Sequence, residues 1–273
     1  MKVSIVTISF NQGRFIEEAI RSVIEQDYQD IEYIVVDPGS TDGSREIIER
    51  YRNKISQIIF EPDDGPADGL NKGFRRATGQ IFSFLNADDF LLRGAVSHII
   101  ECFQNNPDAD AVTGHAIVVD ANGKKLRKMY GHSFSLLDSA YGIAFAIQPS
   151  TYFKASAYRK TKGFNIQNHT AWDDELFIDL KLQGMRFKFT NEFLSAYRVH
   201  STSITGNPSD IHDDKLIKYR QERFEKIMGR KQNRLDALLY TGFRVIKLIR
   251  NPRETFERIR HGPIYGRYKY SKR

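Results

Sequence analysis

Two neighbouring carboxylates, Asp88 and Asp89, follow an apolar run over residues 81–85 after only Asn86 and Ala87. A strand that is buried on both faces of a parallel sheet has such a continuous apolar run. Open α/β sheets bind their ligands in the crevice beyond the carboxyl ends of their strands. Hard divalent cations such as Mg²⁺ and Mn²⁺ prefer carboxylate oxygens and often bridge them to phosphates. The pattern predicts a metal and phosphate site, against the alternative of a solvated turn.

A second acidic pair, Asp173 and Asp174, opens a predicted helix over about 173–183, whose apolar face includes Leu176 and Phe177. Carboxylates in a first turn are favoured by the helix dipole, and this purely structural interpretation predicts a low pKa for both carboxyls. A carboxylate held near a substrate hydroxyl can instead act as a general base. The sequence leaves both interpretations open.

The first 90 residues alternate between predicted strands and predicted helices. We expect strands over 3–9, 32–37, 56–61 and the run through Phe84, and helices over about 14–26, 44–51 and 68–77. Alternation with short links predicts an α/β fold of the Rossmann-like, doubly wound kind, with a mostly parallel central sheet flanked by helices.

The pattern is less regular after Leu92. We expect a helix over 96–103, a hairpin of strands 111–120 and 124–129 around Asn122-Gly123, an apolar stretch over 145–153 and a strand over 186–199. One fold with a change of topology after Asp89 accounts for this pattern more simply than two domains do.

Composition places the chain among ordinary globular proteins, because 40% of its 273 residues are hydrophobic and 27% are charged. The single cysteine, Cys102, excludes an intrachain disulfide and suits a reducing cytoplasm. The N-terminus enters a strand pattern without a signal peptide, and no apolar run reaches the roughly 18 residues of a spanning helix. We therefore expect a cytoplasmic protein.

Positive charge gathers at the C-terminal end. The net charge is +7, yet residues 209–273 alone contain 18 Lys and Arg against 8 Asp and Glu. We predict a catalytic domain over 1–208 and a basic helical extension over 209–273, with helices over about 211–228 and 233–250. The second helix carries one apolar stripe that consists of Leu235, Leu238, Leu239, Gly242, Phe243, Ile246 and Ile249.

A basic amphipathic helix of this kind can lie in a membrane interface that contains anionic lipids, which would here involve residues 233–273. The alternative is that the helix packs on the catalytic part or on a second subunit of a homo-oligomer. We expect no nucleic-acid partner, because the chain has no recognised nucleic-acid-binding motif.

Over about its first 200 residues the chain resembles the inverting GT-A glycosyltransferases of family 2. Four segments carry the resemblance: VSIVTISFN at 3–11, VDPGSTDGS at 36–44, ATG at 77–79 with FLNADD at 84–89, and WDDE at 172–175. The segment NKG at 71–73, after EPDDG at 61–65, is similar to the branch that assembles bacterial surface polysaccharides. The resemblance implies a GT-A-like fold and a nucleotide-sugar donor.

The resemblance also implies residues that bind the donor. Phe10, Asn11 and Asp37 would surround the nucleotide base and ribose, while Pro38 stands where many relatives have a second Asp that contacts the base. Lys72 could reach a phosphate, although Asp68 and Lys72 could equally form an i,i+4 ion pair. The complete donor-binding set that we predict is Thr7, Ser9, Phe10, Asn11, Asp37, Asp68, Lys72, Asn86 and Asp88.

For the metal site, the resemblance implies that Asp89 ligates Mn²⁺ or Mg²⁺, that Asp88 contacts the ribose or a metal-bound water, and that His200 lies near the diphosphate or the metal. For the catalytic base it implies Asp173, from the spacing to Gly184, with Asp174 as the alternative. Residues 148–151 would line the acceptor side.

These implications together predict an inverting, metal-dependent hexosyltransferase. It would use a nucleotide-diphosphate sugar, with UDP as the expected nucleotide, and a glycan or lipid-linked acceptor in surface-polysaccharide synthesis, in the cytoplasm or on the inner face of the plasma membrane. A sugar-nucleotidyltransferase is one alternative, but residues 9–14 are a poor match to the Gly-rich basic loop that it needs. A non-catalytic sugar-nucleotide-binding or membrane-scaffold protein is the other, and the intact acidic pairs argue against it.

Overall fold

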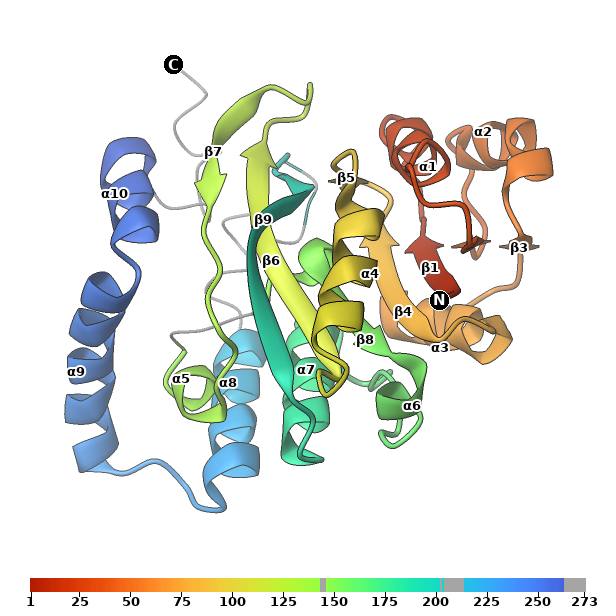
Figure 1. Ribbon diagram of the computed structural model, residues 1–273. Coiled ribbons are helices and arrows are strands. Elements are labelled where there is room, and N and C mark those ends of the chain that lie inside the picture. The colour runs from red at the N-terminus through yellow and green to blue at the C-terminus, as the bar shows by residue number, and fades with distance from the viewer. Residues whose placement is uncertain (143–145, 202, 204–213, 263–273) are drawn as a thin grey trace.

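One mixed β-sheet forms the centre of the molecule (Figure 1). The computed structural model describes residues 1–142, 146–201, 203 and 214–262. In spatial order the strands are β3 (Gln57–Ile59), β2 (Ile31–Val36), β1 (Val3–Ile8), β4 (Ile81–Asn86), β8 (Thr151–Lys154), β6 (Ala111–Val119), β9 (Phe187–Arg198) and β5 (Phe90–Leu91), and β7 (Lys125–Met129) pairs with β6.

Strands β3, β2, β1 and β4 are parallel, and the carboxyl ends of β2, β1 and β4 are level with one another. Ile8 at the end of β1 lies opposite both Val36 of β2 and Asn86 of β4. The chain segments that leave these strands therefore meet at one edge of the sheet.

Beyond β4 the sheet changes direction. Strand β8 runs antiparallel to β4 and β6, while β9 runs parallel to β6. The predicted α/β fold class is confirmed, and so is the hairpin of β6 and β7. The antiparallel share is larger than the strand pattern indicated, because the direction of a strand depends on its pairing partner and leaves no local signal.

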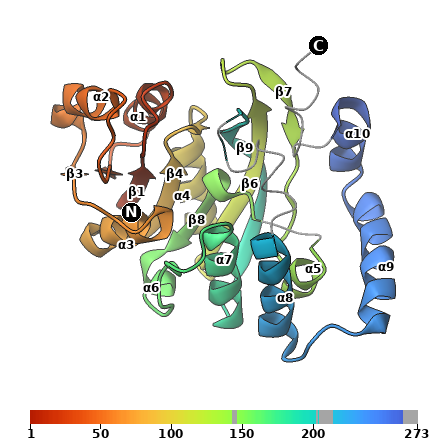
Figure 2. The ribbon, with the colours of Figure 1, turned by 180° about the vertical axis from the view of Figure 1, so that it is seen from behind.

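Helices cover both faces of the sheet. They are α1 (Ile16–Ile24), α2 (Ser44–Arg50), α3 (Pro66–Arg76), α4 (Ala95–Asn105), α5 (Leu136–Ala140), α6 (Ala155–Tyr158), α7 (Trp172–Leu182), α8 (Asp214–Met228), α9 (Arg234–Arg250) and α10 (Pro252–His261), with 3₁₀ turns η1 (Arg52–Lys54) and η2 (Gln148–Ser150). Figure 1 shows α4 in front of the sheet, and Figure 2, from behind, shows α7 and α8 in front.

The elements predicted from the sequence are present, with ends that differ by a few residues. The sequence pattern did not indicate β5, α5, α6 or α10. Some parts of the predictions lie outside the described residues, among them Phe145 in the apolar stretch, residues 211–213 at the start of the first C-terminal helix, and the last eleven residues.

Two hydrophobic clusters, one on each face, hold the helices to the sheet. Leu85 of β4 belongs to the cluster that contains Ile20 of α1 and Ile99 of α4, whereas its neighbour Phe84 belongs to the cluster that contains Phe74 of α3 and Phe177 of α7. Successive side chains of a strand point to opposite faces, so β4 is buried on both sides. The continuous apolar run before Asp88 follows from this position.

The C-terminal helices differ in how closely they pack. Helix α8 contacts α5 and α7, and α10 contacts β7 and α9. In Figure 1, α9 stands at the left edge of the molecule. Among the described residues, none of the helices combines the length and the apolar character that a membrane span requires. The predicted boundary after residue 208 falls outside the described residues and stays a prediction.

We predict that Gly73→Ala destabilises the fold by about 1–3 kcal/mol, as overpacking does. A Cβ at Gly73 of α3 would overlap a methyl group of Val6 on β1, and the β-branched Val6 has little freedom to turn away. The measurement is urea-induced unfolding.

Gly242→Ala in α9 is the matched control, because a Cβ there meets no atom within 4 Å. It should leave the unfolding midpoint unchanged or raise it, since Ala favours a helix over Gly. Equal losses in both variants would contradict the close approach of α3 to β1.

Candidate active site

A cleft of about 600 Å³ lies over the carboxyl ends of β1 and β4. Its wall is made by Ile8, Ser9, Phe10, Gln12, Pro38, Pro62, Asp63, Gly65, Pro66, Asn86, Ala87, Asp88, Asp89, Gln148, Thr170, Trp172, Asp173, Tyr197, Arg198 and Ser203. The cleft lies where parallel β1 and β4 end and the sheet then turns antiparallel, which is the part of an open α/β sheet that binds ligands. Both acidic pairs found in the sequence contribute to it.

Asp89 lies on the cleft wall with only 2% of its surface exposed. One carboxylate oxygen, Oδ1, accepts a hydrogen bond from the Arg198 backbone N–H at 2.8 Å. The other, Oδ2, is buried and has no hydrogen-bond partner among the described residues. Burial and the neighbouring Asp88 raise the pKa of the Asp89 carboxyl well above its usual range. A buried, unpartnered carboxylate oxygen is costly unless a ligand satisfies it.

Asp88 faces His200, with 3.0 Å between Asp88 Oδ2 and His200 Nε2. The His200 ring is buried and packs on Phe15 with 4.6 Å between the ring centroids. The structure therefore brings the three predicted metal-site residues, Asp88, Asp89 and His200, to one side of the cleft.

Arg198 holds this acidic turn in place, and sequence reasoning missed it. Its buried guanidinium donates from Nε to the Asp88 backbone carbonyl at 2.7 Å and from Nη1 to the Asp120 carbonyl at 3.2 Å. It also pairs with Glu18 of α1 and lies over the Phe15 ring. An Arg at the end of the predicted strand, two residues before His200, was the signal that could have found it.

The donor set of this acidic turn fits a divalent cation. Within the described ranges no group of three or more His, Cys, Asp or Glu side chains is arranged to hold a metal ion by itself. Mg²⁺ and ions like it usually take one or two carboxylates and complete their shell with water and substrate phosphates. Asp88 and the unpartnered oxygen of Asp89 provide such a partial set.

Three further members of the predicted donor-binding set line the cleft. The Phe10 ring is 59% exposed, Ser9 Oγ is buried without a hydrogen-bond partner in the described structure, and the same holds for Asn86 Oδ1. Asn86 Nδ2 donates to Gln148 Oε1 at 3.2 Å, which fixes the amide orientation. These groups present one aromatic face and two open acceptors, as a ligand with a flat base and several hydroxyls would require.

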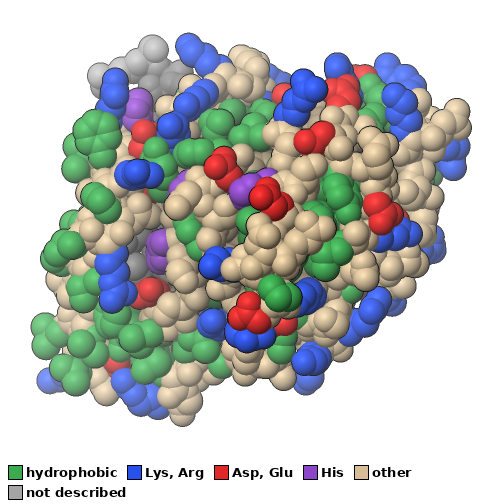
Figure 3. Space-filling view, in the orientation of Figure 1, with side chains coloured by type: hydrophobic (Ala, Val, Ile, Leu, Met, Phe, Trp, Pro, Cys, Tyr) green, Lys and Arg blue, Asp and Glu red, His purple; other side chains and the backbone are tan. Residues whose placement is uncertain are grey.

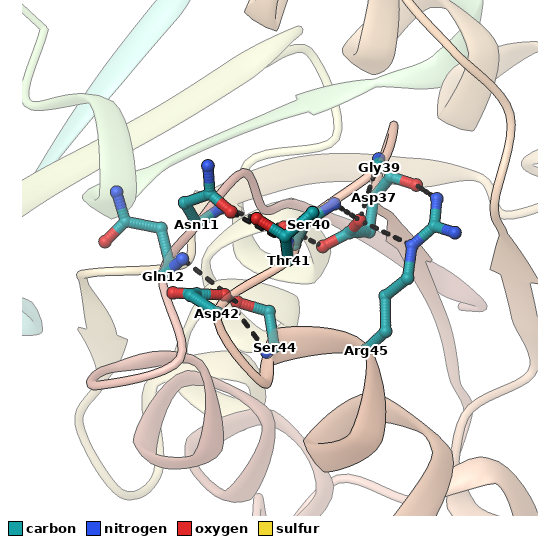
Figure 4. A network of polar contacts seen from close by, with 9 residues as sticks. All are labelled: Asn11, Gln12, Asp37, Gly39, Ser40, Thr41, Asp42, Ser44 and Arg45. Atoms are coloured by element: carbon teal, nitrogen blue, oxygen red, sulfur yellow. Dashed lines mark hydrogen bonds and ion pairs between the residues drawn. The ribbon is translucent and has the colours of Figure 1, made fainter.

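Asp37 and Asn11 hold the neighbouring loop rather than face the cleft (Figure 4). The buried Asp37 carboxylate accepts from the Ser40 backbone N–H at 2.8 Å, from Ser40 Oγ at 2.6 Å and from Arg45 Nε at 3.0 Å. Asn11 Oδ1 accepts from the Thr41 N–H at 2.9 Å, and Asn11 adopts a positive φ of 52°. The predicted contacts of Asp37 and Asn11 with the donor stay predictions, while Pro38 of this loop does line the cleft.

Three other predicted donor-binding residues lie away from the cleft wall. Thr7 is fully buried and accepts from the Tyr33 hydroxyl at 3.0 Å. Asp68 and Lys72 form the i,i+4 ion pair that was the structural alternative, with 2.8 Å between Oδ2 and Nζ. Asp63, from the loop before α3, lines the cleft instead, and burial raises its carboxyl pKa.

The pair at the start of α7 is divided between the cleft and the interior. Asp173 lines the cleft, and burial together with the neighbouring Asp174 raises the pKa of its carboxyl to about 6. Asp174 points into the protein, where its Oδ2 accepts from the Tyr219 hydroxyl at 2.9 Å and from Arg223 Nη1 at 3.0 Å. Burial therefore outweighs the helix dipole that the structural interpretation relied on. Asp173 is the member of the pair that a ligand can reach.

Of the segment predicted for the acceptor side, only Gln148 lines the cleft. Ser150 Oγ donates to the His115 carbonyl at 2.8 Å, and Thr151 Oγ1 donates to Thr113 Oγ1 at 2.9 Å. The sequence analysis gave no role to Trp172 of the WDDE segment, whose buried indole lines the cleft beside Asp173. Its Nε1–H has no acceptor among the described residues.

The sequence matches a family model described as glycosyl transferase family 2 over residues 4–178. The chain belongs to glycosyl transferase family 2. This family 2 enzyme is 31% identical to an uncharacterized glycosyltransferase of Nostoc sp., over 74% of this chain and 66% of the relative. It is 28% identical to the putative teichuronic acid biosynthesis glycosyltransferase TuaG of Bacillus subtilis, over 75% of this chain and 82% of TuaG.

Among solved structures, S. aureus TarS 1-349 in complex with UDP is similar in fold, with a TM-score of 0.62 and 19% identity over 84% of this chain and 71% of that chain. The predicted family and GT-A-like fold are thus confirmed, and the chain is a glycosyltransferase. The roles of individual residues stay predictions.

We predict that Arg223→Met lowers the free energy of unfolding by about 3 kcal/mol or more, because it leaves the Asp174 carboxylate buried without its cation. Urea-induced unfolding measures the effect. Arg220→Met, at an exposed position of the same helix α8, is the control and should change stability by less than about 0.5 kcal/mol. A similar small change for both variants would contradict the structural role of the Asp174–Arg223 pair.

Proposed function

We propose that this family 2 enzyme is an inverting hexosyltransferase that moves a sugar from a UDP-sugar to a glycan or lipid-linked acceptor in the assembly of a cell-surface polysaccharide. The observation that carries the proposal is the presence in one cleft of an unpartnered Asp89 oxygen and of the raised-pKa carboxyl of Asp173, on different elements. The names of TuaG and of the UDP complex of TarS support the acceptor class and the nucleotide.

In this proposal Asp173 is the general base. Its carboxylate takes the proton of the acceptor hydroxyl while that oxygen attacks the anomeric carbon from the face opposite the diphosphate. The bond between the anomeric carbon and the diphosphate oxygen breaks, and its electron pair leaves with UDP. One displacement inverts the configuration and requires no covalent intermediate. A carboxyl pKa near 6 makes Asp173 a stronger base than an ordinary surface Asp, yet leaves it mostly ionised at neutral pH.

Asp88 and Asp89 would hold Mn²⁺ or Mg²⁺, with His200 beside Asp88. When bound, such a cation neutralises the charge that develops on the departing diphosphate. Arg198 keeps both carboxylates in position through the Asp88 carbonyl and its own backbone N–H. The exposed ring of Phe10 offers a flat surface to a pyrimidine base.

The acceptor class bears on where the enzyme works. A lipid-linked acceptor lies at a membrane surface, and we propose the inner face of the plasma membrane as the site of action. Of the alternatives considered from the sequence, the sugar-nucleotidyltransferase and the non-catalytic scaffold do not fit a family 2 glycosyltransferase whose cleft is lined by Asp88, Asp89 and Asp173.

The first test substitutes the two central carboxylates. With UDP-sugars and Mn²⁺, Asp89→Ala and Asp173→Asn should each lower the rate of sugar transfer or donor hydrolysis by about 10²–10⁴-fold, the range typical of a lost general base or charge stabiliser. Asp108→Asn, at an exposed carboxylate that pairs with Arg186, is the matched control and should keep full activity. Near-normal activity in both cleft variants would remove the proposed mechanism.

The second test is the pH dependence of the reaction. Because the raised pKa of Asp173 keeps the carboxyl protonated below about pH 6, kcat/KM should fall about tenfold for each pH unit below that value and level off above it. The measurement is the initial rate from pH 5 to 8 at saturating metal. A profile that stays flat down to pH 5 would exclude Asp173 as the base.

A further inference from the structure

The outer face of α9 is apolar and has no covering element in the described structure. Leu238 and Ile249 are 72% and 74% exposed, and Leu235 and Val245 are exposed as well. These positions recur at helical spacing, so they form one continuous stripe along the helix. In Figure 3 hydrophobic side chains gather along the left edge of the molecule, where α9 lies in Figure 1, with basic side chains among them.

The opposite face of α9 attaches it to the protein through a few specific contacts. Asp236 is buried, accepts from the Tyr141 hydroxyl at 2.8 Å and pairs with Arg230 at 2.6 Å. The Phe243 ring stacks on Tyr141 with 4.6 Å between the centroids. Phe243, which the sequence placed in the apolar stripe, thus belongs to the attached face. These contacts orient the stripe outward.

Helix α10 continues the same arrangement. Phe256 and Ile259 are exposed, the latter by 81%. On the inner face, Glu254 pairs with Arg127 and accepts from the Tyr130 N–H at 3.0 Å. We call the outward side chains Leu235, Leu238, Val245, Ile249, Phe256 and Ile259 the α9–α10 face.

Charge distinguishes this face from an ordinary protein interface. Over residues 234–262 the acidic side chains are Asp236, Glu254 and Glu257, and each accepts hydrogen bonds from the protein side. The basic residues Arg234, Arg250, Arg253, Arg258 and Arg260 are exposed. The surroundings of the α9–α10 face are therefore cationic, because their negative charges are used internally.

We propose that the α9–α10 face lies flat on the surface of an anionic lipid bilayer, with its apolar side chains in the interface and its arginines at the lipid phosphates. A bilayer of this kind provides an apolar medium and negative charge together. A second copy of the chain is a poorer occupant, since a two-fold interface would place the same arginines against one another. The proposal extends the proposed function, because it brings the enzyme to a membrane-borne acceptor, yet lipid binding does not depend on the donor or on catalysis.

The experiment is sedimentation of the full chain with vesicles of phosphatidylcholine alone or with one quarter phosphatidylglycerol. We expect at least tenfold tighter binding to the anionic vesicles at 0.1 M salt, and clear weakening at 0.5 M salt. Leu238→Glu with Ile249→Glu should reduce the binding at least tenfold, and Arg253→Glu with Arg260→Glu should remove its salt-sensitive part. Ile166→Glu, at an exposed apolar position between α6 and α7 and outside the α9–α10 face, is the control.

Light scattering, which measures the oligomeric state, and donor hydrolysis, which measures catalysis, complete the test. The face variants should remain folded by thermal unfolding and should hydrolyse a soluble UDP-sugar at the normal rate, so that loss of lipid binding is separated from loss of catalysis. Equal binding of the native chain to both vesicles, or none, overturns the proposal. A native dimer that Leu238→Glu converts to a monomer would instead assign the face to a second copy and overturn it as well.

Discussion

The buried guanidinium of Arg198 is the interaction on which the architecture of the cleft depends. It comes from the end of β9, yet it bonds to the carbonyl of Asp88 after β4 and pairs with Glu18 of α1. A fully buried cation is tolerated only when most of its donors are satisfied, and here carbonyls, a carboxylate and aromatic faces surround it. The two acidic side chains can therefore lie next to each other at a strand end without displacing the turn that carries them.

The cleft contains buried carboxyls whose charged forms are unfavourable, and a ligand that enters the cleft can stabilise those forms. The Asp89 and Asp173 carboxyls both have raised pKa values because burial penalises their charged forms. Burial also raises the pKa of the Asp174 carboxyl, whose Oδ2 has Arg223 and Tyr219 as partners and whose Oδ1 has no hydrogen-bond partner among the described residues. The difference between these carboxyls is one of position: Asp174 has a cation, Arg223, inside the protein, whereas Asp89 and Asp173 line the cleft, where a ligand can reach them.

The sequence predicted well those features that depend on neighbours in the chain. The apolar run into Asp88 and Asp89 is local, so the position of these carboxylates at the end of a buried strand was readable. The ion pair of Asp68 and Lys72 also follows from their spacing on one helix. Thr7, in contrast, was assigned to the donor by resemblance, although the alternation of side chains along β1 turns it toward Tyr33.

Features that depend on distant pairing were not readable from the sequence. The role of Arg198 requires β9 to run parallel to β6 and to end beside the Asp88–Asp89 turn. The different positions of Asp173 and Asp174 require α8 to pack on α7. Similarly, Arg45 donates a hydrogen bond to Asp37, eight residues earlier, and so holds the loop between them. The residue types in this loop do not indicate that contact.

The contact of Asp174 with Tyr219 and Arg223 has a consequence for where the catalytic unit ends. Every described residue that lines the cleft lies before position 204, so the candidate catalytic groups named above all precede that point in the sequence. The cation that pairs with Asp174, the neighbour of Asp173 on α7, is however Arg223 of α8. A shortened chain that stops before α8 would retain the described residues that line the cleft. It would lose Arg223, the cation that pairs with Asp174 on α7. The segment that a stable fold requires therefore extends further than the segment that carries the reacting groups.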